Sequence, residues 1–305
     1  MKKVLITGAG GAGTFPVWNI LKKKYKIFLA DNDVSSIHPE IPKNCILKIP
    51  LGKSNIFTKK LKRIAKIKNI DLIIPTVDEE ILNIYKDKYL YSISHIPNYE
   101  FTKKTMDKFI LIKELKKLKF KVPNTYLSCS KNISFPKKYI IKPRFGRGSK
   151  NIHLINKKDH IKNYLNLYNY NCKDVILQEY ISGDEYTIFV GMSDNEKLNK
   201  IFPFKVDKKK GITISGRSKN EKKVISFVKK FSEKFKTKNS YNIQLILSSG
   251  NIYPIEVNPR ISTTFFLTLL DGYDPFFLKK NKINNLILAK KKLKLSRHWN
   301  NVIST

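Results

Sequence analysis

Side chains suited to metal and phosphate chemistry gather near residue 250. Glu256, Asn258 and Arg260 place a carboxylate, an amide and a guanidinium at the end of an apolar run. On a strand, Glu256 and Asn258 lie two residues apart, so both side chains point to the same face. Gln244 lies on the preceding apolar run, and a turn at 250–251 predicts a β-hairpin between the two runs. Oxygen ligands at this spacing suit Mg²⁺, although a hairpin ending in solvated Glu and Asn would show the same short motif.

A lysine followed by a glycine-rich loop lies near the middle of the chain. Lys142 ends a predicted strand at 138–142, where an ammonium can act as a point charge on a phosphate. The next residues include a set with free backbone N–H groups that can surround phosphate oxygens: Gly146, Arg147, Gly148 and Ser149. A basic surface turn would have the same composition. The loop therefore indicates a phosphate site only together with other motifs.

A third motif follows the predicted strand at 175–179. Backbone groups at Glu179 and Ile181 can pair with the edge of an adenine ring, and Glu185 can accept hydrogen bonds from ribose hydroxyls. A strand, turn and strand with solvated acids is the alternative interpretation. This segment is therefore a candidate for the base and sugar of a nucleotide.

A separate glycine cluster follows the first predicted strand. Gly8, Gly10 and Gly13 fit G-x-G-x-x-G, and Asp31 closes the next strand at the distance of a ribose-binding acid. This spacing predicts a dinucleotide site. A tight strand-to-helix turn that needs glycine for close packing would have the same sequence. Because the chain carries a second candidate phosphate site, at Lys142 and the loop after it, we favour the packing role for this glycine cluster.

The elements that must position these residues change in type along the chain. Residues 2–97 alternate short apolar strands with amphipathic helices, of which 14–24 and 57–67 are the clearest, and this pattern predicts a parallel sheet covered by helices. A helix is expected at 105–119 and another at 224–235. Strands predominate elsewhere beyond 138, so we expect an α/β (α+β) protein of more than one unit.

Composition narrows the classes of function. The chain has 305 residues, a hydrophobic content of 41% that is ordinary for a globular protein, and no apolar run long enough to cross a bilayer. Three scattered cysteines fit a reducing, cytoplasmic location. The net charge of +36 invites a nucleic-acid interpretation, but the lysines are spread along the whole chain among abundant Asn and Ile. Nucleic acid is therefore not the expected partner, whereas an anionic nucleotide is attracted by this charge.

Taken in order, the motifs resemble those of the ATP-grasp superfamily. The resemblance is nearest to the ATP-binding half of carbamoyl-phosphate synthase large subunits and related carboxylate–amine ligases, and it covers roughly residues 99–275. It rests on residues that recur in one order: Lys108, 140–143, 145–149, 178–185, Gln244 and 256–260. It implies a Rossmann-like pre-ATP-grasp domain at 1–98 and an ATP-grasp domain at 99–305, divided into subdomains at about 99–178 and 179–305.

The resemblance also implies a role for each motif. Lys108 and Lys142 would contact ATP phosphates, with Lys113 on the same helix as an alternative to Lys108. The loop at 145–149 would cover the phosphates, and Glu185 would bind ribose. The adenine pocket would be lined by Gln178, Glu179, Tyr180 and Ile181. Mg²⁺ or Mn²⁺ would be held by Gln244, Glu256 and Asn258.

The activity that the resemblance implies is ATP-dependent ligation. Arg260 and Lys142 would be the catalytic residues, a carboxylate would be activated as an acyl phosphate with release of ADP, and an amine or ammonia would then form the amide. Small-molecule carboxylates and amines are the expected partners, with a homodimer as the oligomer considered. An NAD(P)-dependent oxidoreductase and a basic nucleic-acid-binding protein remain the alternatives, and Lys205 and Arg217 have no assigned role.

Overall fold

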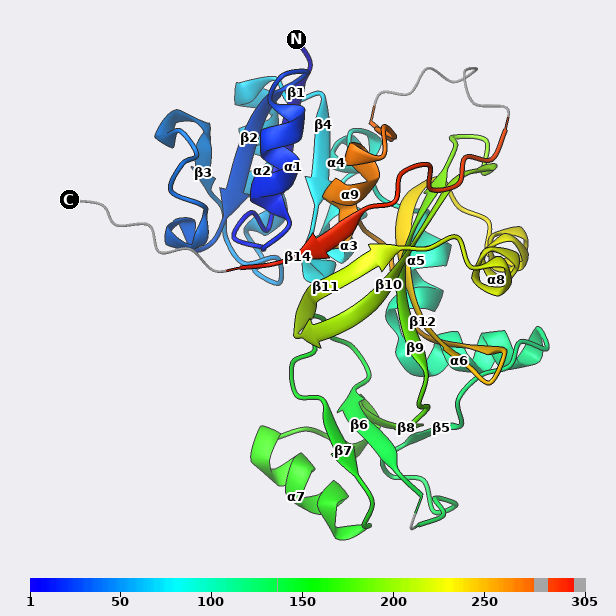
Figure 1. The fold of residues 1–305 in the computed structure, drawn as a ribbon. Coiled ribbons are helices and arrows are strands. Elements are labelled where there is room, and N and C mark those ends of the chain that lie inside the picture. The colour runs from blue at the N-terminus through cyan, green and yellow to red at the C-terminus, as the bar shows by residue number, and fades with distance from the viewer. Residues whose placement is uncertain (136, 277–284, 299–305) are drawn as a thin grey trace.

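The computed structural model describes residues 1–135, 137–276 and 285–298, which form three β-sheets with helices around them (Figure 1). The parts of the expected 99–305 unit at 277–284 and 299–305 lie outside the described residues. The mixture of parallel and antiparallel sheets with helices confirms the predicted mixed α/β class.

The first unit is a four-stranded parallel sheet in the order β3-β2-β1-β4. Its strands are β1 (Lys3–Thr7), β2 (Lys26–Asp31), β3 (Ile46–Lys48) and β4 (Leu72–Pro75). The apolar runs of β1, β2 and β4 are buried because helices cover the sheet, whereas the edge strand β3 is only partly buried. Those helices are α1 (Thr14–Leu21), α2 (Phe57–Lys68), α3 (Asp78–Ile84) and α4 (Lys88–Ser92), with short 3₁₀ turns η1 (Val34–Ser36) and η2 (Lys43–Cys45).

Helix α2 illustrates how the sequence forms these elements. Phe57, Leu61 and Ala65 recur every four residues, lie on one face of the helix, and are fully buried against the sheet. Asn69 adopts a left-handed conformation with φ of 52° and ends the helix, as asparagine does readily. The predicted helix at 57–67 is therefore confirmed to within a residue.

A smaller antiparallel sheet, in the order β5-β8-β6-β7, carries Lys142, for which a phosphate contact was predicted. Its strands are β5 (Thr125–Leu127), β6 (Tyr139–Pro143), β7 (His153–Ile155) and β8 (Val175–Glu179), with helix α7 (Asp159–Tyr168) and the 3₁₀ turn η3 (Cys172–Asp174) beside them. Figure 1 shows this unit standing apart from the first sheet, below the larger one. Its core includes Tyr139, Ile141 and Leu177.

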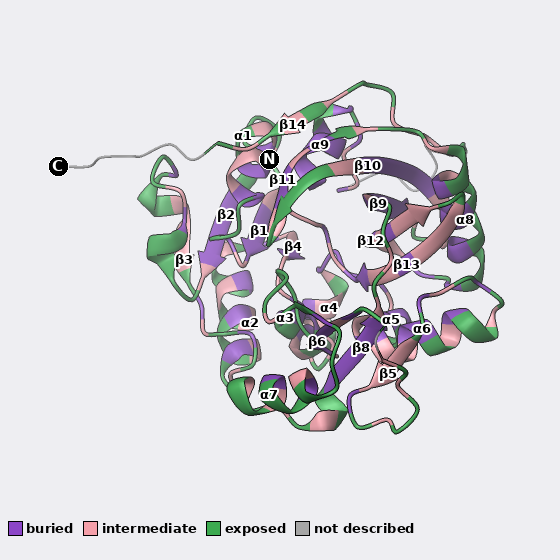
Figure 2. Ribbon diagram, turned by 60° about the horizontal axis from the view of Figure 1, so that its bottom comes forward, coloured by how far each residue is buried: buried purple, intermediate pink, exposed green. Residues whose placement is uncertain are grey.

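The larger sheet is six-stranded and antiparallel, in the order β13-β12-β9-β10-β11-β14. Its strands are β9 (Asp184–Met192), β10 (Leu198–Lys210), β11 (Ile212–Ser218), β12 (Asn239–Ser248), β13 (Asn251–Asn258) and β14 (Lys294–Ser296). Two helices, α8 (Lys222–Lys234) and α9 (Phe265–Leu270), lie in the same part of the chain as these strands. Figure 2 shows β10 passing from buried to exposed toward the β10–β11 hairpin.

The helical segment near residue 105 differs from its prediction. In place of one helix at 105–119, the structure has α5 (Tyr99–Met106) and α6 (Lys108–Lys117). The side chain of Asp107 accepts hydrogen bonds from the N–H groups of Phe109 and Ile110, and so caps a new helix at that point. Both helices also contribute to the core of the larger sheet, although the expected subdomain boundary placed them with the smaller one.

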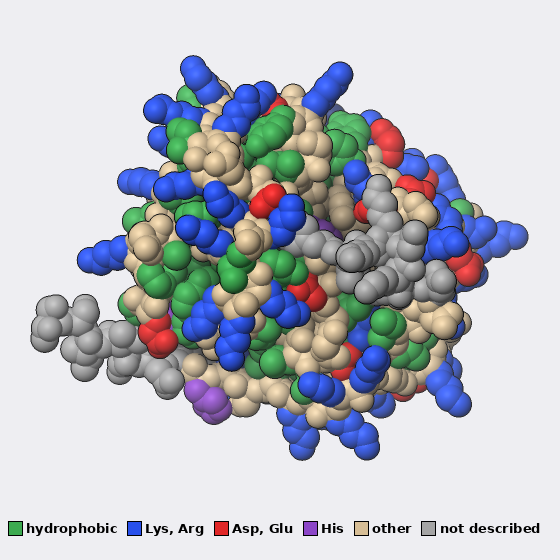
Figure 3. Space-filling view, turned by 90° about the horizontal axis from the view of Figure 1, so that it is seen from above, with side chains coloured by type: hydrophobic (Ala, Val, Ile, Leu, Met, Phe, Trp, Pro, Cys, Tyr) green, Lys and Arg blue, Asp and Glu red, His purple; other side chains and the backbone are tan. Residues whose placement is uncertain are grey.

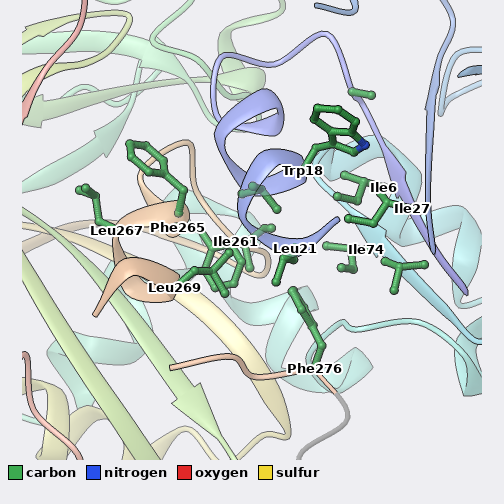
Figure 4. Packing of buried hydrophobic residues seen from close by; sticks show 14 of the residues in the cluster. Ile6, Trp18, Leu21, Ile27, Ile74, Ile261, Phe265, Leu267, Leu269 and Phe276 are labelled. Atoms are coloured by element: carbon green, nitrogen blue, oxygen red, sulfur yellow. The ribbon is translucent and has the colours of Figure 1, made fainter. Parts of the chain in front are cut away.

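The first unit and the larger sheet share a continuous core. Figure 4 shows Trp18 and Leu21 of α1 with Ile6 and Ile74 of the first sheet on one side, and residues 261–276 on the other. Phe265 is fully buried in this cluster. Burial of this shared apolar surface therefore holds the two parts together.

The excess of basic residues forms no single stripe on the face seen in Figure 3. Lysine and arginine side chains there are distributed among apolar and acidic ones. Within the described residues, we find no helix long and apolar enough to span a membrane.

Candidate functional site

A cavity of about 710 Å³ lies where the three sheets meet. The smaller sheet contributes Lys142, and residues 178–181 follow from its strand β8. The larger sheet contributes the tip of the β10–β11 hairpin and residues within β12 and β13. The first unit contributes the glycine turn at 8–14 and Glu80. Residues predicted from separate motifs therefore line one cavity.

The predicted metal ligands lie together at the β12–β13 hairpin. Gln244 and Glu256 are direct partners in the antiparallel register, and Asn258 follows two residues later on β13. All three line the cavity. The set has one carboxylate and two amides, which suits a Mg²⁺ that takes its remaining ligands from phosphate oxygens.

Lys142 lies at the end of β6, where its side chain is almost completely buried. Its ammonium donates to Oε1 of Gln178 at 2.9 Å. Burial lowers the pKa of Lys142 to about 7, although the nearby carboxylate of Glu256 favours the charged form. An anionic ligand would therefore raise the pKa of Lys142 and favour its charged form.

Lys108 is held at the first position of α6 by the Asp107 cap. Asp107 is itself fixed by Arg144, whose Nη2 lies 2.6 Å from the Asp107 carboxylate. The Lys108 ammonium donates to the carbonyl of Gly146 at 2.8 Å and lies 3.6 Å from Oε1 of Glu256. Lys113, the alternative, is exposed on the same helix.

The glycine-rich loop needs glycine at two of its positions. Gly146 has φ of 145° and Gly148 has φ of 69°, values that other residues rarely adopt. Arg147 donates to a carboxylate oxygen of Glu79 at 3.2 Å, and Ser149 donates to the carbonyl of Gly211 at 3.1 Å. The loop thus contacts both the first unit and the β10–β11 hairpin.

The predicted adenine-binding segment lies along one wall of the cavity. Some of its hydrogen-bonding groups are already paired with other residues of the protein. The N–H of Glu179 donates to the carbonyl of Asn124, and the Glu179 carboxylate accepts from the Asn124 side chain at 2.8 Å. The N–H of Ile181 has no partner among the residues that the structure describes. A base edge would therefore find its free N–H donor at Ile181 and not at Glu179.

Arg260 follows β13 in the chain, and an acid of the first unit fixes its side chain. Its Nε donates to Asp78 at 2.5 Å, and its Nη2 lies 3.4 Å from Oδ1 of Asn258. Burial opposes its charge, but the Asp78 carboxylate holds the pKa of Arg260 above its ordinary value. Arg260 is therefore a charged and oriented donor at the cavity wall.

Lys209 is a site residue that the sequence did not single out. Its ammonium lies 2.5 Å from Glu185 and 3.1 Å from Oε1 of Gln244, so it links the predicted ribose and metal positions. The lysine run before Gly211 was the available signal, but only the register of the β10–β11 hairpin selects this lysine. Lys205 and Arg217 instead pair with Asp184 and Asp207.

The first glycine cluster is engaged in packing. The N–H of Gly10 donates to the Asp31 carboxylate at 2.8 Å, and the other oxygen of that carboxylate accepts from the N–H of Asp33 at 3.1 Å. A Cβ at Gly13 would lie 2.7 Å from the Cα of Thr263. Both observations agree with the packing role, because the Asp31 carboxylate already accepts hydrogen bonds from the N–H groups of Gly10 and Asp33.

Glu80 is an acid that faces the same cavity from the first unit. It is almost completely buried and accepts a hydrogen bond from the Thr7 hydroxyl. Burial raises the pKa of Glu80 to about 8, with a smaller contribution from the carboxylate of Asp31. At neutral pH the Glu80 carboxyl group on this wall of the cavity is therefore largely protonated and uncharged.

Comparisons with known proteins agree with this geometry. A family model described as an ATP-grasp domain matches residues 105–264, which is more than half of the chain. Tyramine–L-glutamate ligase from Methanocaldococcus jannaschii is 26% identical over 259 residues, covering 81% of this chain and 71% of that protein.

Two solved structures show the same fold. The biotin carboxylase domain of 2-oxoglutarate carboxylase from Hydrogenobacter thermophilus, in complex with MgADP and bicarbonate, has a TM-score of 0.69 and 16% identity. The match covers 90% of this chain and 67% of that one. Pyruvate carboxylase from Rhizobium etli has a TM-score of 0.66 and 13% identity, and there the match covers 90% of this chain but only 28% of that one.

Proposed function

The chain belongs to the ATP-grasp family, and on that premise we propose that it is an ATP-dependent carboxylate–amine ligase. The observation that carries the proposal is the convergence of Lys142, Arg260 and the Gln244–Glu256 pair on one cavity. Cations suited to phosphate and oxygens suited to a metal meet there beside a segment with a free backbone donor.

ATP and Mg²⁺ fit the residues of this cavity. Glu256 and Asn258, with Gln244 opposite, would hold the metal, whose charge would neutralise the transferring phosphoryl group. Lys142 and Lys108 would contact the phosphates, and the loop at 145–149 would cover them. Ile181 would pair with the base, with Gln178, Glu179 and Tyr180 around it, and Glu185 would bind ribose.

The chain's own residues then orient two successive reactions. An oxygen of the substrate carboxylate attacks the γ phosphorus, the bond to the β-phosphate oxygen breaks, and an acyl phosphate and ADP result. The amine nitrogen attacks the acyl carbon, loses a proton and expels phosphate. Arg260, oriented by Asp78, would stabilise the negative charge on the acyl phosphate and its transition states.

The first unit would supply the substrate end of the cavity. We assign residues 1–98 as a pre-ATP-grasp domain, since its parallel sheet places the glycine turn and Glu80 on the cavity wall. The turn approaches the segment 262–264, which follows Arg260 and Ile261 in the chain. A cytoplasmic location and a homodimer stay predictions from the sequence.

The nucleotide product and a trapped intermediate test this proposal. L-Glutamate with tyramine is the first pair to try, because the relative from Methanocaldococcus jannaschii carries that name. With the right carboxylate, hydroxylamine should capture the acyl phosphate as a hydroxamate while ADP is released. Release of AMP and pyrophosphate would mean an adenylate intermediate and would refute the mechanism. A phosphorylated alcohol without hydroxamate would identify a kinase instead.

A further inference from the structure

Glu80 has a carboxyl oxygen that the protein itself does not use. The residue is 3% exposed, and its Oε2 accepts a hydrogen bond from the Thr7 hydroxyl. Among the residues that the structure describes, no donor contacts the other oxygen, Oε1. Because Glu80 lines the cavity, a ligand in the cavity can supply the missing partner.

The other carboxylates of the cavity lining are already paired. Each of them lies beside a cation or an amide donor: Asp31 beside the N–H groups of Gly10 and Asp33, Glu179 beside Asn124, Glu185 beside Lys209, and Glu256 beside Lys108. The guanidinium of Arg147 donates to Glu79, the residue before Glu80. Within the described part of the chain, Glu80 is therefore the acid of this lining that has neither a cation nor an N–H donor.

The wall around Glu80 is apolar on the side of the first unit. The segment 50–52 passes so close that a Cβ at Gly52 would lie 2.8 Å from both Cγ and the backbone nitrogen of Glu80. Pro50 and Leu51 of this segment line the cavity, as does Val77 at the start of α3. A ligand that suits this wall has a positively charged donor for Oε1 and an apolar body for these side chains.

Helix α3 connects Glu80 with the proposed position of the acyl phosphate. Asp78, two residues before Glu80 on this helix, accepts the hydrogen bond from Nε of Arg260. Arg260 and Glu80 both line the cavity. Of the two substrates of a carboxylate–amine ligase, the amine is the one that carries a positive charge before it reacts. The free oxygen of Glu80 therefore matches the amine.

On the basis of the proposed function, we propose that Glu80 binds the amine substrate as its ammonium and accepts the proton that the nitrogen must lose. The substrate class is a primary amine with an apolar body. One proton passes from the ammonium to Oε1 of Glu80, and the freed lone pair forms the bond to the acyl carbon. The bond from that carbon to the phosphate oxygen breaks, and a second proton leaves with the phosphate. Glu80 then returns its proton to solvent.

The charge state of Glu80 agrees with this role. Burial raises the pKa of Glu80 to about 8. From neighbouring positions, the carboxylates of Asp31 and Glu79 also raise this pKa, and the guanidinium of Arg147 lowers it. An incoming ammonium favours the carboxylate and so displaces its proton. A carboxylate with a raised pKa is also a better proton acceptor than an ordinary one.

Calorimetric titration without nucleotide tests the binding of the ammonium. At about pH 7, the wild type should bind 2-phenylethylamine at least about tenfold more tightly than the uncharged 2-phenylethanol, because only the ammonium pairs with Glu80. Glu80→Gln should lose this preference, whereas Glu40→Gln, which changes an exposed acid of the same unit, should keep it. Glutamine imitates the protonated acid of the free protein, so Glu80→Gln should fold, as thermal melting will show. A wild type without the preference, or a preference that survives in Glu80→Gln, would overturn the proposal.

Hydroxylamine separates this inference from the proposed function. It is mostly uncharged at neutral pH and needs no ammonium site, so Glu80→Gln should form hydroxamate at a rate within about threefold of the wild type. With the same carboxylate, kcat/KM for 2-phenylethylamine should fall by about 100-fold in this variant. If the wild type forms no hydroxamate, the proposed function fails, and the calorimetric result still decides whether Glu80 binds an ammonium. Hydroxamate formation without ligation of 2-phenylethylamine by the wild type, or unchanged amine kinetics in Glu80→Gln, would overturn the assignment.

Discussion

Glu256 is the carboxylate on which the proposed metal site depends. It lies 3.6 Å from the Lys108 ammonium, and its charge also acts on Lys142 and Arg260. Its side chain thus belongs to the proposed metal ligands and also acts on the cations that are proposed to bind phosphate. Removing its charge while keeping its shape separates these electrostatic roles from packing.

We predict that Glu256→Gln lowers ligase turnover by about 100-fold or more, because metal stabilisation of the transferring phosphoryl is worth several kcal/mol. Folding should hold, since the side chain keeps its volume. Steady-state ADP release and thermal melting measure the two effects. The exposed Glu233→Gln on α8 is the control and should behave as wild type. Near-normal turnover of Glu256→Gln would remove Glu256 from the site.

The lowered pKa of Lys142 predicts proton uptake on nucleotide binding. With a pKa of about 7 in the free protein, Lys142 is mostly neutral at about pH 8. A bound triphosphate favours the ammonium, so binding should draw in a proton at that pH. Uptake should fade toward about pH 6, where Lys142 is already charged.

Calorimetric titration with ATP in two buffers of different ionisation enthalpy measures this uptake. Lys142→Gln should bind ATP more weakly and without the Lys142 contribution. Lys113→Gln, on the exposed face of α6, should keep it. Equal proton uptake in wild type and Lys142→Gln would show that the titrating group lies elsewhere.

At the scale of elements, the first glycine turn joins two parts of the fold. Its residues pack against the segment after Arg260, and a side chain at Gly13 would meet the Thr263 backbone at 2.7 and 2.8 Å. At Gly11 the nearest atom is 3.4 Å away, and neither glycine has a positive φ. Two neighbouring glycines in one turn therefore differ in how closely another chain segment approaches them.

We predict that Gly13→Ala destabilises the protein by about 1–3 kcal/mol, because backbone atoms must move to make room. Gly11→Ala is the matched control and should change the free energy of unfolding by less than about 0.5 kcal/mol. Denaturant unfolding of both variants decides the point. Equal stability with loss of nicotinamide-cofactor binding in Gly13→Ala would instead support the dinucleotide interpretation.

At the scale of the whole molecule, Arg297 joins three walls of the cavity. Its guanidinium donates to the carbonyls of Ala12, Thr213 and Thr263 at 2.9, 3.0 and 2.7 Å. These residues belong to the glycine turn, to β11 and to the segment after β13. Its charge centre also lies 5.5 Å from the ring of Phe266. The planar guanidinium of Arg297 thus sets the spacing of these three walls at the proposed substrate end of the cavity.

We predict that Arg297→Ala raises the KM for the carboxylate substrate by about tenfold and leaves ATP affinity little changed, because three charge-assisted hydrogen bonds are lost. Arg297→Lys should restore little, since an ammonium lacks the planar fork. Millimolar guanidinium should partly rescue Arg297→Ala. The exposed Arg63→Ala is the control. A lysine variant with wild-type kinetics would contradict this role.

Much of this protein follows from local sequence patterns. The spacing of Glu256 and Asn258, the glycines at 146 and 148, and the alternating apolar runs of the first unit determine strands, turns and side-chain direction over a few residues. These are short-range properties of the backbone, so the hairpin and the loop were predictable from the chain alone. The Asp107 cap was missed because a helical pattern continues on both sides of it.

Other features depend on tertiary structure. Three features each join residues far apart in the chain: the position of Lys209 beside Gln244, the Glu79–Arg147 contact and the three carbonyls at Arg297. Nothing in a local pattern specifies such partners. They are selected by sheet register and by the shared apolar core, which bring distant segments to one place and leave few side chains within reach of each other.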